Sequence, residues 1–347
     1  MLFLVGLCAW GQEDARPTQT FPGLLNPAIS ANGVFLGGLQ ATDGAIEDPT
    51  PAPVPGQGET FGTGLSIGEI EVQFDAAVDP YFKAKVVLAL PGGEGVEAEE
   101  AFVSLVSVPR LLVNIGKFKQ PFGRENLLHR HALPTADRSL IGQAMFGEEG
   151  LNDMGVHAAV LLPTPWFSEL TVGGDAGNNE VVYGSGEPDG LGAMAHWKNL
   201  LDAGSTSVEL GLSGLTGRAP GGRTTAEGVD LTVKARGRGP HQFQRLVWQS
   251  EGMIAQLPER GEPLAGFYST LEGSFNKRFW LGGRYDRVGL DADTASQAAT
   301  AVATLVPTEF SAVRVQAQRQ FLPEGHVIDS ALAQLTFSIG AHPAHAY

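Results

Sequence analysis

The sequence predicts an all-β protein in which one antiparallel sheet of about sixteen strands closes into a transmembrane barrel. Apolar and polar side chains alternate with a period of two over most of the chain, as expected for strands with one apolar and one polar face. Short turns alternate with longer loops along the sequence. The segments between them are roughly 9–11 residues long, which is the length of a tilted strand that crosses a bilayer.

The alternation is clearest in a hairpin near the start of the predicted barrel. In segment 68–78, apolar side chains alternate with acidic or amide ones, and in 82–90 they alternate with Lys83 and Lys85. A four-residue turn joins the two segments. Antiparallel pairing therefore predicts that Asp75 lies near Lys83.

The same pattern continues to the end of the chain. The predicted strands are 28–37, 68–78, 82–90, 97–106, 111–119, 155–162, 167–174, 191–198, 206–215, 229–236, 242–249, 267–275, 279–288, 298–306, 310–320 and 330–340. The longest predicted loops are 39–63, 120–154, 176–190 and 217–228. An even number of antiparallel strands places short periplasmic turns on one rim and long extracellular loops on the other.

Aromatic residues gather beside the predicted short turns, where they would form a girdle at one membrane interface. They are Tyr81, Phe82, Trp166, Phe167, Phe243, Phe275, Phe279, Trp280 and Phe310. A soluble β-sandwich has no reason to place its aromatics at one end. The last strand, 330–340, and the final Tyr347 resemble the C-terminal sorting strand of bacterial outer-membrane proteins. An ordinary last strand of a soluble sheet would alternate in the same way.

The N-terminal segment is apolar and too short to span a bilayer, so it is predicted to be a signal peptide. Ala9 and Gly11 are the small residues before a cleavage that would leave Gln12 first. The usual basic region is missing, as in a signal peptide truncated at its start. We therefore expect a signal peptide at 1–11, a lead-in at 12–26 and the barrel at 27–347. The mature chain would contain no cysteine and hence no thiol chemistry.

The net charge of −15 argues against a nucleic-acid partner, because nucleic acid requires a basic face. The charge is compatible with a membrane barrel whose acids line a lumen. Motifs for a nucleophile elbow, a zinc protease or a phosphate-binding loop are missing from the sequence. We expect neither enzymatic activity nor a cofactor, except for the zinc considered below.

Two short segments resemble a known family. Segment 111–123, LLVNIGKFKQPFG, resembles the G-x-F-K-x-P-F-G piece of the phosphate-selective porin O/P family, which are sixteen-stranded outer-membrane channels. Segment 282–286, GGRYD, is similar to that family's late G-x-R-Y-D strand. The chain also resembles porin-like proteins labelled zinc-regulated outer-membrane receptors, in which a His-x-His follows P-F-G, as His129 and His131 do here.

The resemblance implies a passive channel for small polar solutes or ions in the lipid of the outer membrane, assembled as a homotrimer. Phosphate selectivity is not carried over, because a chain of net charge −15 shows no basic ladder. Two alternatives remain open at this point. One is an outer-membrane barrel without a channel, whose extracellular loops bind a metal or ligand. The other is a soluble β-protein of the periplasm.

Charged side chains at alternate strand positions are predicted to face the lumen. They are Glu69, Glu71, Asp75, Lys83, Lys85, Asp230, Lys234, Arg284, Asp286 and Arg314. These charges could simply pair with one another in a wet interior, or some could set the electric field of a pore.

A metal site is a second hypothesis for the loop after segment 111–119. In an extended backbone His129 and His131 share one face and could present two imidazoles to zinc, with Asp137 as a third ligand. The alternative is that both histidines are solvated.

The long loop at 120–154 is predicted to fold into the lumen. It carries large apolar side chains that need a wall to pack against, namely Leu127, Leu128, Leu133, Leu140, Ile141, Met145 and Phe146. A sixteen-stranded barrel has room for such a loop. Arg124, Arg130 and Arg138 would then place positive charge at a constriction and favour anions locally. The alternative is that the loop packs on its neighbours and leaves the pore open.

Overall fold

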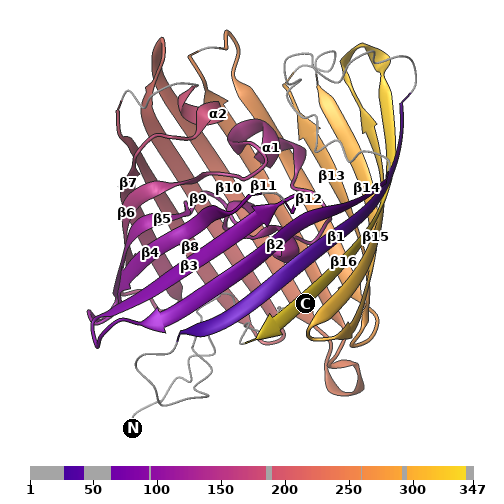
Figure 1. Cartoon of the computed structure of the whole chain (residues 1–347), viewed down its shortest axis with the longest axis horizontal. Coiled ribbons are helices and arrows are strands. Elements are labelled where there is room, and N and C mark those ends of the chain that lie inside the picture. Colours follow the sequence, from indigo (N-terminus) through magenta and orange to yellow (C-terminus); the bar gives the residue numbers. More distant parts are fainter. Residues whose placement is uncertain are drawn as a thin grey trace.

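The computed structural model describes residues 27–42, 64–93, 95–184, 190–258, 260–290 and 295–340. The predicted signal peptide and lead-in lie outside these residues. Sixteen antiparallel strands form one closed barrel, in which sequence neighbours pair and β1 closes against β16 (Figure 1). The predicted fold class is confirmed.

All sixteen predicted segments are strands. Their bounds are β1 (Ala28–Thr42), β2 (Gly64–Ala77), β3 (Phe82–Pro91), β4 (Glu97–Leu105), β5 (Leu111–Lys119), β6 (Asn152–Leu161), β7 (Phe167–Asp175), β8 (Gly192–Ala203), β9 (Thr206–Ala219), β10 (Gly222–Arg236), β11 (Arg245–Gln256), β12 (Leu264–Ser274), β13 (Phe279–Val288), β14 (Ser296–Thr308), β15 (Ser311–Phe321) and β16 (Val327–Gly340). The short helices are η1 (Glu125–Leu127), η2 (Arg130–Ala132), α1 (Leu140–Phe146), α2 (Glu180–Tyr183), η3 (Gly239–His241) and η4 (Pro323–Gly325).

The predicted loop at 217–228 is wrong, because β9 and β10 continue through most of it and leave only 220–221 as a turn. Its glycines permit close approach from inside the barrel. A Cβ on Gly217 would overlap the ring of Tyr183, and a Cβ on Gly228 would lie 2.8 Å from the ring of Phe122. In the sequence these glycines resemble turn residues, although they make room for side chains that fill the lumen.

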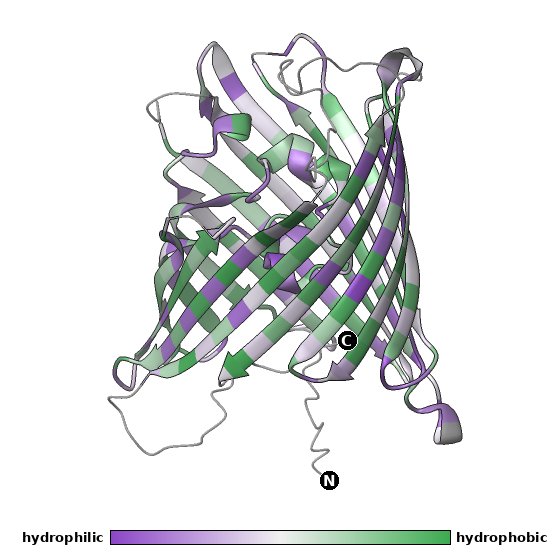
Figure 2. Ribbon diagram, turned by 45° about the vertical axis from the view of Figure 1, so that its right-hand side comes forward, coloured by the Kyte–Doolittle hydropathy of each residue, from purple (hydrophilic) through white to green (hydrophobic). Residues whose placement is uncertain are grey.

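Side chains alternate between the two faces of the wall, as Figure 2 shows in the banding of the strands. On β15, Val313 and Val315 are exposed on the outside, whereas Arg314 and Gln316 are buried on the inside. Exposed leucine, isoleucine, valine and phenylalanine side chains recur around the outer surface. Such a surface suits lipid rather than water, so the barrel is built to lie in the outer membrane. The soluble alternative does not fit it.

The first hairpin has a different register from the one predicted. Asp75 pairs with Lys85, and Lys83 pairs with Ala77. The turn is tightened by Asp79, whose Oδ1 accepts hydrogen bonds from the backbone N–H groups of residues 81 and 82, at 2.7 and 2.8 Å. The observed pairing is shifted by two residues from the predicted one. A shift of two keeps every side chain on the same face of the strand, so the glutamates and lysines still face the lumen as predicted.

The aromatic girdle forms at the rim of the short turns, with two exceptions, Phe167 and Trp280. Phe167 occupies a lumen-facing position on β7, in step with Glu169 and Thr171, and Lys198 lies over its ring. Tyr81, Trp166, Phe275 and Phe310 are exposed there, as are further members of the predicted set. Trp280 is 7% exposed and packs inside the barrel with Val306 and Ala312. Because Trp280 follows outward-facing Phe279, the strand alternation turns it inward. No helix in the described part of the chain is long and apolar enough to cross a bilayer.

Val72→Arg is expected to destabilise the folded barrel by about 2–4 kcal/mol, because it places a charge on the lipid face. Val72 lies between Ala31 and Leu88 on the neighbouring strands. The matched control is Gln73→Arg, on the lumen face, where Gln73 already donates to Asp75 at 2.5 Å. Urea unfolding and heat-modifiable gel mobility report stability. Equal damage from both substitutions would show that the assigned faces are wrong.

Candidate functional site

The segment between β5 and β6, residues 120–151, lies inside the barrel and is called the lumen loop here (Figure 1). Its large apolar side chains Leu133, Leu140, Ile141, Met145 and Phe146 are at most 3% exposed. The predicted inward fold is therefore confirmed. Leu127 is an exception, since it is 38% exposed.

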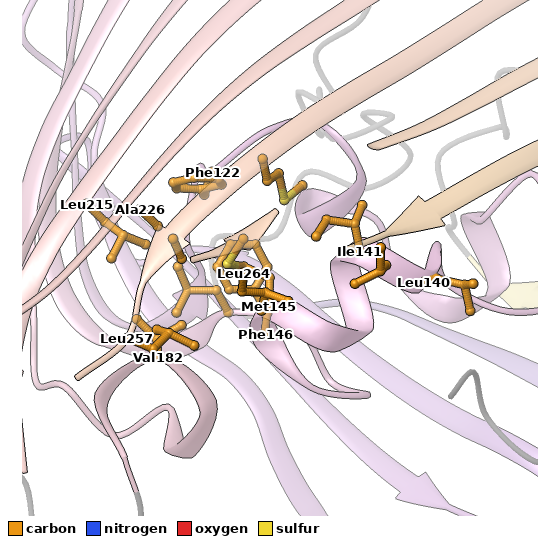
Figure 3. Packing of buried hydrophobic residues seen from close by; sticks show 14 of the residues in the cluster. Phe122, Leu140, Ile141, Met145, Phe146, Val182, Leu215, Ala226, Leu257 and Leu264 are labelled. Atoms are coloured by element: carbon orange, nitrogen blue, oxygen red, sulfur yellow. The ribbon is translucent and has the colours of Figure 1, made fainter. Parts of the chain in front are cut away.

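One side of the lumen loop is held by apolar packing. The α1 helix begins after Ser139, whose Oγ accepts a hydrogen bond from the Gly142 N–H at 3.1 Å. Its apolar side chains lie against β11, β12 and β13 and against α2. Figure 3 shows them beside lumen-facing side chains such as Leu215 and Leu264. Each large side chain buried in this way contributes roughly 1.5–3 kcal/mol.

Arg284 on β13 anchors the segment just before α1. Its Nη2 lies 2.9 Å from Asp137 Oδ2, and its Nε lies 2.7 Å from Asp286 Oδ2. It also donates to the Asp137 carbonyl at 2.9 Å and to the Thr135 hydroxyl. Asp286 in turn accepts from the Leu140 N–H at 3.0 Å. The Arg284 side chain is 1% exposed, so this cation is enclosed by carboxylates and loop oxygens.

A buried carboxylate on β11 holds the beginning of the lumen loop. Glu251 Oε1 accepts from the backbone N–H groups of Arg124, at 3.0 Å, and Glu125, at 2.6 Å. Glu125 then accepts from the Ser139 N–H and hydroxyl, at 3.0 and 2.6 Å. The loop is therefore linked to the wall and to itself through carboxylates.

Two of the three arginines predicted at the constriction, Arg124 and Arg138, hold the loop. Arg124 pairs with Glu209 at 2.9 Å. Arg138 is 6% exposed and donates to the carbonyl oxygens of residues 125, 128 and 148. Arg130 also has an interaction partner. These contacts do not support the predicted role of free cations facing a pore.

Residues 129–131 of the lumen loop meet a cluster of carboxylates on β2 and β4. His129 Nδ1 lies 3.2 Å from Glu99 Oε2, and His129 Nε2 lies 3.2 Å from Glu100 Oε2. His131 Nδ1 lies 2.9 Å from Glu71 Oε2, and the two imidazole rings stack with centroids 5.8 Å apart. Both histidines are thus buried contacts between loop and wall.

Ion pairs connect the basic and acidic side chains of this cluster. Lys119 pairs with Glu99 at 2.8 Å, and Lys85 pairs with Glu100 at 2.7 Å. Burial by itself lowers the pKa of His129, but the nearby carboxylates, led by Glu71, raise that pKa well above its usual value. Cationic His129 and the two lysines therefore lie among the three glutamates.

Glu99 and Glu100 were not identified from the sequence as site residues. The pairing of β3 with β4 shifts between Val87 and Leu88, which leaves Glu99 as an extra residue in a β-bulge. The bulge allows two consecutive glutamates to reach the cluster. The sequence feature that could have revealed this bulge is the pair of adjacent acids, Glu99 and Glu100, in a strand whose side chains otherwise alternate.

The structure brings two of the predicted metal ligands, His129 and His131, side by side but places the third, Asp137, elsewhere. Asp137 is bound to Arg284, away from the histidines. Ligand atoms of Glu71, Glu99 and His129 instead lie within 4.8 Å of one another. These are the residue types that zinc accepts, so any metal at the loop would take this set rather than Asp137.

All ten residues predicted to face the lumen occupy lumen-facing positions of their strands. These residues belong to several separate groups of contacts inside the barrel. Glu71 and Lys85 belong to the histidine cluster, Arg284 and Asp286 hold α1, and Asp230 lies on the wall near Arg124. Arg314 donates to the Thr135 carbonyl at 3.0 Å and to Gln334 at 2.9 Å. Their role in setting the field of a pore stays a prediction.

Comparisons with known proteins agree with this fold. An uncharacterized protein of Aquifex aeolicus (strain VF5) is 27% identical over 334 residues, which cover 82% of this chain and 70% of that protein. No family model matches the chain, so the resemblance to phosphate-selective porins is not confirmed.

Among solved structures, OprB of Pseudomonas putida has a TM-score of 0.63 at 11% identity, with 90% of this chain and 94% of that chain covered. The anion-selective porin from Comamonas acidovorans has a TM-score of 0.58 at 11% identity, with 90% and 98% covered. The trimer form of OmpT, an outer-membrane protein of Vibrio cholerae, has a TM-score of 0.58 at 9% identity, with 90% and 100% covered. At these identities the likeness establishes the porin fold.

Proposed function

We propose that this protein is a porin-like channel of the outer membrane, through which small polar solutes or ions diffuse passively. The observation that carries the proposal is a closed sixteen-stranded wall with an apolar outside, a polar inside and a loop folded into its lumen. Barrels of this size leave an aqueous interior, and an inserted loop narrows it. The surrounding partner is outer-membrane lipid.

The oligomeric state is part of the same proposal. The trimer form of OmpT supports a homotrimer for this chain, because both share the barrel architecture. Cross-linking in detergent, followed by gel electrophoresis, tests the trimer independently of conductance.

Planar-bilayer recording tests the channel directly. The folded full-length chain is expected to give stable conductance steps with weak ion selectivity, because cations at the lumen loop are paired with carboxylates. Arg124 with Glu209 and Arg284 with Asp137 are two such pairs. A salt gradient should therefore give a reversal potential near zero. A folded barrel that inserts without conducting would favour the alternative of a barrel without a channel.

A second candidate function is metal binding by the lumen loop, and the approach of Glu71, Glu99 and His129 within 4.8 Å favours it. We propose that zinc displaces the proton on His129 and fixes the loop to the wall. Affinity should fall as the pH falls, because proton and metal compete for the imidazole.

Isothermal titration calorimetry with zinc tests this candidate. The site should disappear in the double variant His129→Ala, His131→Ala. The matched control is His241→Ala, His326→Ala, which removes two exposed histidines outside the cluster. Equal zinc titrations of the two double variants would exclude a metal role for the loop while leaving the channel proposal intact.

A further inference from the structure

A shallow groove of about 660 Å³ crosses the outer face of β1, β14, β15 and β16. Its floor is a row of small side chains that lie opposite one another on neighbouring strands. Ala331 pairs with Ala317, and Ala317 pairs with Ala301. The three alanines point away from the lumen, because they alternate with lumen-facing side chains on their strands. Leu39, which pairs with Ala331 and is 65% exposed, closes the row on β1.

The groove exists because larger side chains border this row. On β13 the row continues with Gly283, which pairs with Ala301. Toward the periplasmic rim the outer face carries exposed branched side chains, namely Leu281, Leu305 and Val315. A rigid neighbour would leave the floor of such a groove without contacts and lose dispersion attraction there. A flexible hydrocarbon chain can follow the floor and fill it.

An ion pair lies at the extracellular end of the groove. Arg319 and Asp329 pair with each other across β15 and β16, two residues beyond the alanines. Arg319 Nε donates to Asp329 Oδ1 at 2.7 Å, and Nη2 donates to Oδ2 at 2.8 Å. The two side chains are 59% and 48% exposed.

This ion pair leaves one edge of the Arg319 guanidinium available. The Nη1 group has no hydrogen-bond partner among the described residues, and Nη2 uses one of its two N–H bonds for Asp329. Two parallel N–H bonds from one guanidinium edge match the oxygens of a phosphate. Asp329 fixes the orientation of the guanidinium, so the available edge is presented beside the groove.

Other polar side chains mark the same level on the outer face. The Tyr285 hydroxyl donates to Gln297 at 2.7 Å, and Tyr285 pairs with Ala299, which also lines the groove. Arg287 donates to the carbonyl oxygen of Leu290 at 3.3 Å. Tyrosine and arginine at the end of an apolar wall are typical of the level where lipid headgroups begin. The alanine floor therefore lies at the depth of acyl chains.

A lipid fits this surface better than a second copy of the chain. Protein laid over the groove would bury the Arg319–Asp329 pair, and the loss of hydration would offset the attraction between the charges. A lipid headgroup leaves the pair in contact with water and adds a phosphate. We propose that the groove binds an acyl chain of an outer-leaflet lipid whose phosphate is held by Arg319. This lipid site is additional to the proposed channel and does not depend on conductance.

Native mass spectrometry of the folded full-length chain, freed of lipid in detergent, tests the proposal. The probes are diphosphorylated lipid A and the same lipid without its phosphates, which share their acyl chains. Lipid A is expected to bind saturably and about tenfold more tightly than the form without phosphate. Equal affinity for the two lipids would overturn the assignment of a phosphate to Arg319.

A substitution in the floor locates the acyl chain. Ala317→Phe fills the groove and should weaken the binding of both lipids about tenfold. The matched control is Ala195→Phe, which changes another exposed, outward-facing alanine, on β8 far from the groove, and should leave lipid binding unchanged. Both variants add apolar surface toward the membrane, and heat-modifiable gel mobility establishes that they fold. Lipid A binding by Ala317→Phe at the original affinity would refute the site.

Charge substitutions test the headgroup contact. Asp329→Asn should strengthen lipid A binding several-fold, because it removes an anion beside the phosphate while its amide oxygen can still accept from Arg319. The double variant Arg319→Gln, Asp329→Asn should bind the two lipids equally. A double variant that kept the preference for the phosphorylated form would show that the phosphate is bound elsewhere.

The oligomeric state distinguishes the lipid from a second copy. If Ala317→Phe separated the oligomer into single chains and left lipid A binding unchanged, the groove would be a contact between subunits and the proposal would fail. A folded barrel that binds lipid A in the groove without conducting would remove only the channel proposal.

Discussion

Replacement of Arg284 by methionine is expected to destabilise the docked lumen loop by about 3–5 kcal/mol, because it leaves buried carboxylates without their cation. Asp137 and Asp286 both lie within 2.9 Å of the Arg284 guanidinium. Hydrogen exchange of amides in 133–146, measured by mass spectrometry, should report the loosened loop. The strands should remain protected, since the backbone pairing of β13 does not depend on this side chain.

The control for this prediction is Arg223→Met. Arg223 is exposed on β10 and donates to the Thr216 hydroxyl at 3.3 Å. It should leave exchange in the lumen loop unchanged. If the Arg284 variant exchanged as slowly as the unmodified protein, the ion pairs with Asp137 and Asp286 would not be what holds the loop.

Deletion of residues 127–146 is expected to raise single-channel conductance several-fold, because it removes α1 and most of the material inside the barrel. The deletion also exposes Glu71, Glu99 and Asp286 to the lumen after their loop partners are lost. Selectivity should therefore shift toward cations. Both effects are measured by planar-bilayer recording in symmetric salt and in a salt gradient.

Removal of residues 239–241, which form η3 in a turn at the opposite rim, provides a control deletion that should not change conductance. Heat-modifiable gel mobility would establish that both deletion variants fold. A folded variant without 127–146 that conducts like the full chain would show that the lumen loop is not the constriction.

Local patterns in the sequence were enough to predict the barrel. Period-two alternation located every strand, and β5 and β13 begin and end at the predicted residues. The apolar residues of 120–154 also predicted that this loop needs a wall. Each of these features depends on residues that are close together in the sequence, so one sequence is enough to predict them.

The partners of the lumen loop could not be predicted in the same way. Asp137 and Arg284 are 147 residues apart in sequence, and no local pattern links them. The register of the first hairpin and the bulge that turns Glu99 inward depend on how strands slide past one another. Trp280 shows that a local pattern can also mislead. Its position beside a short turn predicted a place in the aromatic girdle, but its side chain packs inside the barrel.

The contacts of the lumen loop impose an order on the assembly of the barrel. The Ala136 N–H donates to Gln316, which comes 180 residues later in the chain, and Gln316 and Gln318 both donate to Asp137. The loop is thus synthesised long before β15, on which it finally rests. Contacts this distant in sequence form late, after most of the entropy of closing the chain has been lost. The wall must therefore be almost complete before the lumen loop can become ordered. Until the loop docks on β15, the lumen is wider than in the mature barrel.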